Sequence, residues 1–189
     1  SSAASDVYKR QVRVIAQQYA WNIHYPGPDG KFGATRIDLV DEQDNPIGLD
    51  RSSEFAEDDF TTINQLHIPV NRKIRVDLSS KDVIHNFKLP ELRVSQDAIP
   101  GMVIPVHFTA TSTSEEFFKT AVGTKRVRKG LEIACAQLCG LGHYRMKGYV
   151  TIHEEDDYQA WLDEQAAYLE EEDGDDWGDD GDDWGDDDW

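Results

Sequence analysis

The segment Cys135–Met146 constrains this chain more than any other stretch, because it gathers four soft metal-ligating side chains. Cys135 and Cys139 are the two cysteines of the 189-residue chain, and His143 and Met146 follow them at short spacing. Thiolates, imidazoles and thioethers suit copper, whereas calcium and magnesium prefer oxygen ligands. The segment therefore predicts a site for a soft transition metal.

Two glycines, Gly140 and Gly142, favour a loop over a helix here, so the ligand side chains can converge. A mononuclear blue-copper site uses one cysteine, two histidines and a weak axial ligand. Two thiolates in one loop can instead bridge two metals, and such a centre needs a further histidine from elsewhere. His85 is the candidate, since it stands where an alternating strand should give way to a turn.

Two other interpretations of the cysteines remain open at this point. The pair could form a disulfide or remain as two buried thiols. Two cysteines and two histidines could also hold zinc in tetrahedral geometry. Met146 and the all-β character of the surrounding sequence weigh against zinc.

Three motifs together resemble the copper A (CuA) domain of cytochrome c oxidase subunit II, of the haem–copper oxidase family. They are the cysteine loop, Asp82-Val-Ile-His85-Asn-Phe87 with Pro90 and Leu92, and Asp97-Ala-Ile-Pro100-Gly101. The resemblance covers about residues 12 to 165. It implies an all-β, cupredoxin-like Greek-key sandwich that carries two copper ions. Such a domain accepts electrons from cytochrome c and passes them to the haem of subunit I.

The resemblance also assigns the metal ligands, which are His85, Cys135, Gln137, Cys139, His143 and Met146. The two cysteines would bridge the coppers, each histidine would bind one copper, and the methionine would be a weak axial ligand. Gln137 would contribute its backbone carbonyl. Relatives usually have Glu at this position, whose carboxylate helps to hold magnesium against subunit I. An amide is a poorer magnesium ligand, which weakens the expectation of that site here. No catalytic acid, base or nucleophile is expected.

The resemblance further implies where electrons arrive. Family members often carry Gln-Trp-x-Trp, and this chain has Gln18-Tyr19-Ala20-Trp21 instead. Tyr19, with Trp21 nearby, is therefore the expected point at which electrons enter. The alternative is that both are core aromatic residues on a strand.

The formal net charge of −18 belongs mainly to the end of the chain. Residues 154–189 hold 19 acidic residues and no Lys or Arg, whereas residues 1–153 hold 18 acidic and 19 basic residues. The acidic balance argues against nucleic acid as a partner. An acidic tail is usually a solvated extension, and it could also attract a basic cytochrome c.

Alternating apolar residues predict strands, and the expected organisation is one β-domain with extensions. Residues 11–25 should form one long strand with a bulge near Gln17 and Gln18, and residues 41–60 a polar excursion over the surface. Short antiparallel-type strands are expected at 66–70 and 74–78, and further strands at 103–108, 116–119, 131–135 and 149–152. The expected parts are a leader (1–10), the copper domain (11–153), an amphipathic helix (154–172, helical over about 155–171) and a disordered tail (173–189). Trp161 should pack the helix against the sandwich.

No run of 18 apolar residues is present, so no membrane span is expected within these residues. The resemblance implies a missing N-terminal transmembrane segment. It also implies a position on the extracytoplasmic face of the membrane, on the periplasmic side of a bacterial inner membrane. Two alternative functions are the copper domain of a nitrous oxide reductase and a non-catalytic copper- or zinc-binding module. The Asp97-Ala-Ile-Pro-Gly context favours the oxidase.

Overall fold

The computed structural model describes residues 9–120 and 130–174, which form two packed β-sheets with flanking helices. The strands are β1 (Lys9–Gln17), β2 (Ala20–Tyr25), β3 (Phe60–Ile63), β4 (Gln65–Pro69), β5 (Lys73–Ser80), β6 (His85–Leu89), β7 (Val94–Ala98), β8 (Ile104–Thr109), β9 (Leu131–Cys135) and β10 (Lys147–His153). The α-helices are α2 (Ser114–Lys119) and α4 (Glu155–Gly174). Short 3-10 turns are η1 (Ile37–Leu39), η2 (Pro90–Leu92) and η3 (His143–Arg145).

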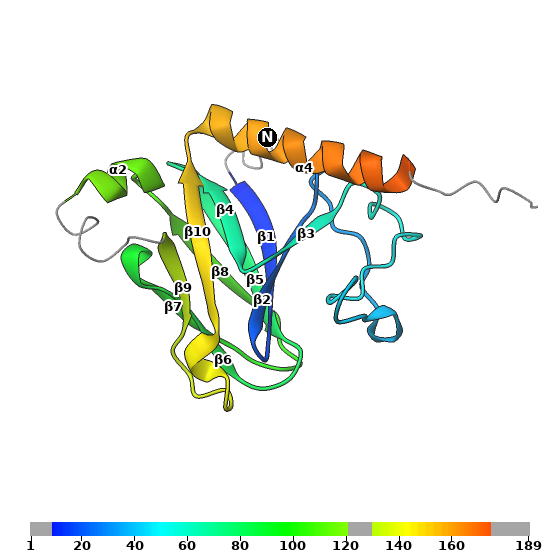
Figure 1. The fold of residues 1–189 in the computed structure, drawn as a ribbon, viewed down its shortest axis with the longest axis horizontal. Helices are drawn as coiled ribbons and strands as arrows, with labels where there is room; N and C mark the ends of the chain where they lie inside the picture. The colour runs from blue at the N-terminus through cyan, green and yellow to red at the C-terminus, as the bar shows by residue number, and fades with distance from the viewer. Residues whose placement is uncertain (1–8, 121–129, 175–189) are drawn as a thin grey trace, which may run out of the picture.

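Each sheet has five strands, in the orders β3-β2-β1-β5-β8 and β4-β10-β9-β6-β7. The predicted all-β sandwich is therefore confirmed. Strand β1 pairs with β5, and β10 with β4, in parallel; the other pairings described are antiparallel. The expectation of antiparallel strands alone was wrong at these two pairs. Helix α4 lies across one end of the sandwich, and the loop that contains η3 lies at the other (Figure 1).

The core fills the space between the two sheets, as the alternating pattern predicts. On β1, Val12, Val14 and Ala16 are buried. The opposite sheet contributes side chains from β4, β6, β9 and β10. The largest fully buried side chains are Trp21, Tyr25, Phe87, Ile23, Leu66, Ile68, Ile74, Leu78, Leu89, Leu131, Ile133 and Met146. Met146 thus joins the candidate ligand loop directly to the core.

The predicted single strand over residues 11–25 is a hairpin. Gln17 pairs with Ala20 across a two-residue turn, and β1 and β2 run antiparallel. The bulge expected near Gln17 and Gln18 is therefore this turn, where the alternation of apolar residues changes phase. It contains none of the Gly, Asn or Asp residues that usually mark such turns. A contact from a distant segment holds it, because the Gln18 amide donates to Oδ2 of Asp82 at 2.7 Å.

Two further expectations about local structure were wrong. Residues 116–119 belong to α2 rather than to a strand. The side chain of Thr113 accepts from the Glu116 amide while the Glu116 carboxylate accepts from the Thr113 amide. This reciprocal cap satisfies two donors at the helix start and so favours the helix. His85 opens strand β6, after the turn that follows β5, and does not end a strand.

The excursion between β2 and β3 extends to one side of the sandwich (Figure 1). It has its own small apolar cluster, formed by Ile47, Leu49 and Ala56, with Ile15 of β1 packed against it. This contact attaches the excursion to the first sheet. In the described ranges no helix combines the length and the apolar character that a membrane span requires.

Helix α4 confirms the predicted C-terminal helix and extends to Gly174. The ring of Trp161 stacks on His67 of β4 with centroids 4.0 Å apart, and it meets Tyr25 and Phe60 edge-on. The expected packing against the sandwich is therefore present. Strand β1 begins at Lys9, so the end of the presumed leader is part of the sheet. Residues 1–8 and 175–189, which carry most of the predicted leader and tail, lie outside the described residues.

Candidate metal centre

The cysteine loop connects two neighbouring antiparallel strands, which fixes both of its ends. Ala134 of β9 pairs with Lys147 of β10. Cys135 and Met146, the next residues inward, therefore begin and end the loop side by side. Within the loop, the Met146 amide donates to the carbonyl of His143 at 3.1 Å, which closes the η3 turn. The sequence thus folds its four soft side chains into one compact loop.

The remaining histidine arrives from the strand on the other side of β9. Phe87 of β6 pairs with Cys135, so the start of β6 lies beside the loop. Sγ of Cys135 is 3.8 Å from Sγ of Cys139, and 3.9 Å from Nδ1 of His85. Nδ1 of His143 is 3.5 Å from Sγ of Cys139. Each sulfur therefore has one imidazole nitrogen beside it.

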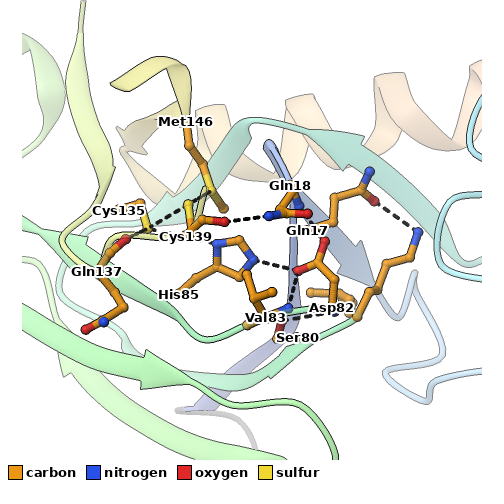
Figure 2. A network of polar contacts seen from close by, with 12 residues as sticks. Gln17, Gln18, Ser80, Asp82, Val83, His85, Cys135, Gln137, Cys139 and Met146 are labelled. Atoms are coloured by element: carbon orange, nitrogen blue, oxygen red, sulfur yellow. Dashed lines mark hydrogen bonds and ion pairs between the residues drawn. The ribbon is translucent and has the colours of Figure 1, made fainter. Parts of the chain in front are cut away.

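The remaining two predicted ligands, the Met146 thioether and the Gln137 carbonyl, each lie beside one of the two sulfurs. Sδ of Met146 lies 3.8 Å from Sγ of Cys139, and the carbonyl oxygen of Gln137 lies 3.2 Å from Sγ of Cys135 (Figure 2). The side chain of Gln137 is exposed, so only its backbone faces the cluster. The structure thus brings together all six groups that the sequence singled out.

The two cysteines are free thiols, because a disulfide has its sulfurs about 2.05 Å apart. Cys139 is buried and Cys135 is partly exposed. Burial, followed by the hydrogen bond with Cys135, raises the pKa of Cys139 to about 11. Without a metal this thiol therefore keeps its proton at neutral pH. A bound cation would have to displace that proton, because metals bind the thiolate.

A second layer of polar contacts supports the cluster from the hairpin turn (Figure 2). Oδ1 of Asp82 lies 2.8 Å from Nε2 of the fully buried His85. Nε2 of Gln18 donates to the carbonyl of Cys139 at 2.5 Å, and the Gln18 amide donates to Asp82. Gln18 and Asp82 thus join the histidine strand to the cysteine loop. Both residues stand in the sequence motifs quoted above, where neither has a predicted role.

Partial burial raises the pKa of Asp82, but hydrogen bonds outweigh this effect. The Gln18 amide, His85 and the Val83 amide all act on its carboxylate, and its pKa falls below the usual value. Asp82 is therefore ionised at neutral pH and accepts a hydrogen bond from the Nε2–H of His85. This leaves Nδ1 of His85 as the nitrogen that faces Cys135.

Both aromatic residues proposed for electron arrival border the cluster. Trp21 is fully buried, and its ring lies edge-on to His85 with centroids 6.2 Å apart. Tyr19 lies against the loop, because a Cβ added to Gly142 would be 2.5 Å from the tyrosine ring. Trp21 is thus a core residue beneath the histidine, and Tyr19 is a partly buried residue against the loop.

The other histidines lie away from this cluster. His24 is buried against Asp59, His67 bonds to His153, and His107 is exposed on β8. The cluster that the structure offers to a soft metal therefore consists of the groups on the cysteine loop and His85.

Comparison with known proteins gives a consistent result. A model for the periplasmic domain of cytochrome c oxidase subunit II matches residues 11–152. The alternative cytochrome c oxidase subunit 2 of Bradyrhizobium diazoefficiens is 34% identical over 157 residues, which cover 82% of this chain and 50% of the relative. Cytochrome c oxidase subunit 2 of Cereibacter sphaeroides is 28% identical, over 81% of this chain and 48% of the relative.

A solved structure is similar as well. The crystal structure of the periplasmic domain of subunit II of cytochrome oxidase from Bradyrhizobium japonicum is 25% identical and superposes with a TM-score of 0.54. The match covers 85% of this chain and 95% of that one. The two curated relatives are longer, and the chain spans about half of their length.

Proposed function

This chain belongs to the cytochrome c oxidase subunit II family, and we propose that it is the periplasmic domain through which a respiratory oxidase takes up electrons. One observation carries the proposal. Two thiols lie 3.8 Å apart, and each has its own imidazole nitrogen beside it, at 3.9 Å and 3.5 Å. This symmetry suits two metals that share a pair of sulfurs.

The donor set fits copper better than zinc. A structural zinc site takes four protein ligands in a closed tetrahedron. Here Met146 and the Gln137 carbonyl add a fifth and a sixth donor, one beside each sulfur. A thioether is a soft, weak ligand typical of copper electron-transfer sites. We therefore assign His85, Cys135, Gln137, Cys139, His143 and Met146 as ligands of a binuclear CuA centre.

Two bound copper ions would supply a one-electron couple whose charge is shared through both sulfurs. The task of this chain is to hold the ligands still, because fixed ligands need little rearrangement when the charge changes. The buried Met146 and Cys139 anchor the loop in the core. Asp82 fixes the imidazole of His85, and Gln18 fixes the backbone of Cys139. These contacts fix the ligands from outside the cluster.

The surface around the loop supports protein partners. Leu138, Leu141 and Tyr144 are 80%, 96% and 73% exposed, although they are large and apolar. Exposed apolar side chains gathered at one site are typical of protein–protein contact. We propose cytochrome c as donor and subunit I of the oxidase, with its haem, as acceptor, on the extracytoplasmic face of the membrane. We do not propose magnesium, because the Gln137 side chain is a neutral amide.

Metal content and an EPR spectrum of the copper-loaded chain test this proposal. We expect two coppers per chain and hyperfine splitting from one electron shared by both nuclei. Cys135→Ser should abolish this signal, and His107→Ala, which changes an exposed histidine away from the cluster, should keep it. One copper with splitting from a single nucleus, or zinc without a redox response, would contradict the proposal. Reduction of the loaded centre by cytochrome c then tests the donor.

A further inference from the structure

A second group of potential ligands lies far from the sulfur cluster in sequence and differs from it in chemistry. Asp29 is in the turn after β2, and Asp58 and Asp59 directly precede β3. One carboxylate oxygen from each of the three lies within 4.8 Å of the others. The burial of the three side chains increases in the order Asp29, Asp58, Asp59. The group therefore extends from the surface into the protein.

Asp59 is the unusual member, because its side chain is fully buried. Its Oδ2 atom lies 2.5 Å from Nε2 of His24 and accepts from the Gly33 amide at 2.8 Å. Its Oδ1 atom is also buried, and it has no hydrogen-bond partner among the described residues. A buried carboxylate oxygen without a partner is costly, so it calls for a ligand.

The two other carboxylates are arranged in the same way. Oδ1 of Asp29 accepts from the Lys31 amide at 2.7 Å, and Oδ2 of Asp58 accepts from the Asp29 amide at 3.0 Å. In each residue a backbone N–H thus orients one oxygen and leaves the second free of protein partners in the described ranges. Gly27, with φ of +67°, lets the turn approach closely, since a Cβ there would collide with the backbone of Asp58.

The protein neutralises the negative charge of this group only in part, since the Arg13 guanidinium acts on Asp59 from beyond ion-pair distance. His24 is the partner of Asp59, and no Lys or Arg of residues 9–120 and 130–174 forms an ion pair with any of the three carboxylates. The nearby Lys31 places its ammonium over the ring of Phe55, at 4.2 Å. Carboxylates this close repel each other unless a cation lies between them.

We propose that Asp29, Asp58 and Asp59 form a binding site for a calcium ion. Calcium is a hard cation that takes six to eight oxygen ligands, including carboxylates, in flexible geometry. Magnesium demands an octahedron and keeps more of its water, which suits a buried Asp59 oxygen less well. The ion would tie the turn after β2 to the start of β3, and so close the base of the excursion. This site is independent of the proposed copper centre.

Thermal unfolding of the full chain tests the site, after divalent cations are removed and with the cysteines kept reduced. A calcium dissociation constant of about 0.1–1 mM, as in extracellular modules, should raise the melting temperature by roughly 3–10 °C at about 10 mM calcium. Sodium chloride of equal ionic strength is the salt control. Asp29→Asn and Asp58→Asn should each lose most of the rise, because each removes a charged oxygen from the proposed site. Each variant still has an oxygen that can accept the backbone N–H, so the turn should keep its shape.

Asp44→Asn is the matched control, because Asp44 is an exposed carboxylate of the same excursion outside the group. The melting temperature of this variant should rise with calcium as that of the wild type does. Both proteins keep the acidic C-terminal residues, so any calcium bound there affects them equally. An NMR titration locates the ion, with saturable shifts expected at the amides of Asp29, Lys31 and Gly33. The site does not exist if sodium and calcium raise the melting temperature equally. It also does not exist if Asp58→Asn keeps the full calcium response.

Discussion

Oδ1 of Asp82 lies 2.8 Å from Nε2 of His85, while Nδ1 of the same ring faces Sγ of Cys135 at 3.9 Å. A carboxylate on the outer nitrogen of a ligating imidazole fixes its tautomer and raises its basicity. Asp82→Asn keeps the shape but removes the charge. We expect it to weaken copper binding about 10- to 100-fold. A copper titration against a chromophoric chelator measures this.

The control for this variant is Asp38→Asn, which changes an exposed carboxylate paired with Arg36 on the excursion. It should leave the copper affinity unchanged. Equal affinities for Asp82→Asn and the wild type would mean that the Asp82 contact does not assist the ligand.

Residue 142 must be a glycine because the Tyr19 ring lies against it, and not because of its backbone conformation. Its φ of −91° is open to any residue, but a Cβ there would be 2.5 Å from the tyrosine ring. Gly142→Ala must therefore push the loop or the ring aside, at a cost of about 1–3 kcal/mol in the free energy of unfolding. Urea unfolding of the metal-free chain measures this cost.

The double variant Tyr19→Ala, Gly142→Ala tests whether the Tyr19 ring is the obstacle. In a Tyr19→Ala background the added methyl group has space, so Gly142→Ala should then cost much less. An unchanged cost would show that Tyr19 is not the obstacle, and the close packing of ring and loop would lose its support.

The sequence predicted those parts of the molecule that depend on local pattern. Alternating apolar residues located β1, β4, β5, β8, β9 and β10, and the spacing of the cysteine loop identified groups that the structure brings together. His85 could also be chosen, because a binuclear site needs a second histidine. Each inference needed only residue types and their spacing.

Apart from α2, whose capping box is local, the missed features depend on contacts between distant segments. Gln18 and Tyr19 form a hairpin turn without any of the usual turn residues, because Asp82, 64 positions away, binds the Gln18 amide. Alternation also cannot tell which neighbour a strand has, so the parallel pairing of β1 with β5 was not foreseen. The roles of Gln18 and Asp82 beside the cluster follow from the same fold and were invisible for the same reason.

Trp161 joins α4 to the sandwich through aromatic contacts with His67, Tyr25 and Phe60. Truncating a buried tryptophan costs about 3–5 kcal/mol, and the ring of Trp161 is partly exposed, so we expect roughly 2–3 kcal/mol for Trp161→Ala. Chemical denaturation measures the change. Tyr168→Ala, on the same helix and 54% exposed, should stay within about 0.5 kcal/mol. Equal effects of the two variants would contradict the packing role.

His67 makes the docking of α4 sensitive to pH. Its Nδ1 atom lies 2.8 Å from Nε2 of His153, so one ring must donate and the other accept. Burial, followed by the proximity of His153, lowers the pKa of His67 from 6.5 to about 4. The unfolded chain therefore binds this proton at a higher pH than the folded chain. The contribution to stability is complete above pH 6.5 and is lost as the pH falls from 6.5 towards 4.

Melting temperatures between pH 7.5 and pH 4 test this, with His67→Phe as the reference. Phenylalanine keeps a ring that can stack on Trp161, and the backbone of residue 67 can still bond to the Tyr25 hydroxyl, but the variant has no proton to bind at this position. Carboxylates titrate in both proteins, so the difference between the two curves reports on His67 together with His153, which is bonded to it and whose pKa burial also lowers. The wild type should lose more stability than the variant below pH 6.5. Parallel curves would mean that His67 is protonated as easily in the folded chain as in the unfolded one.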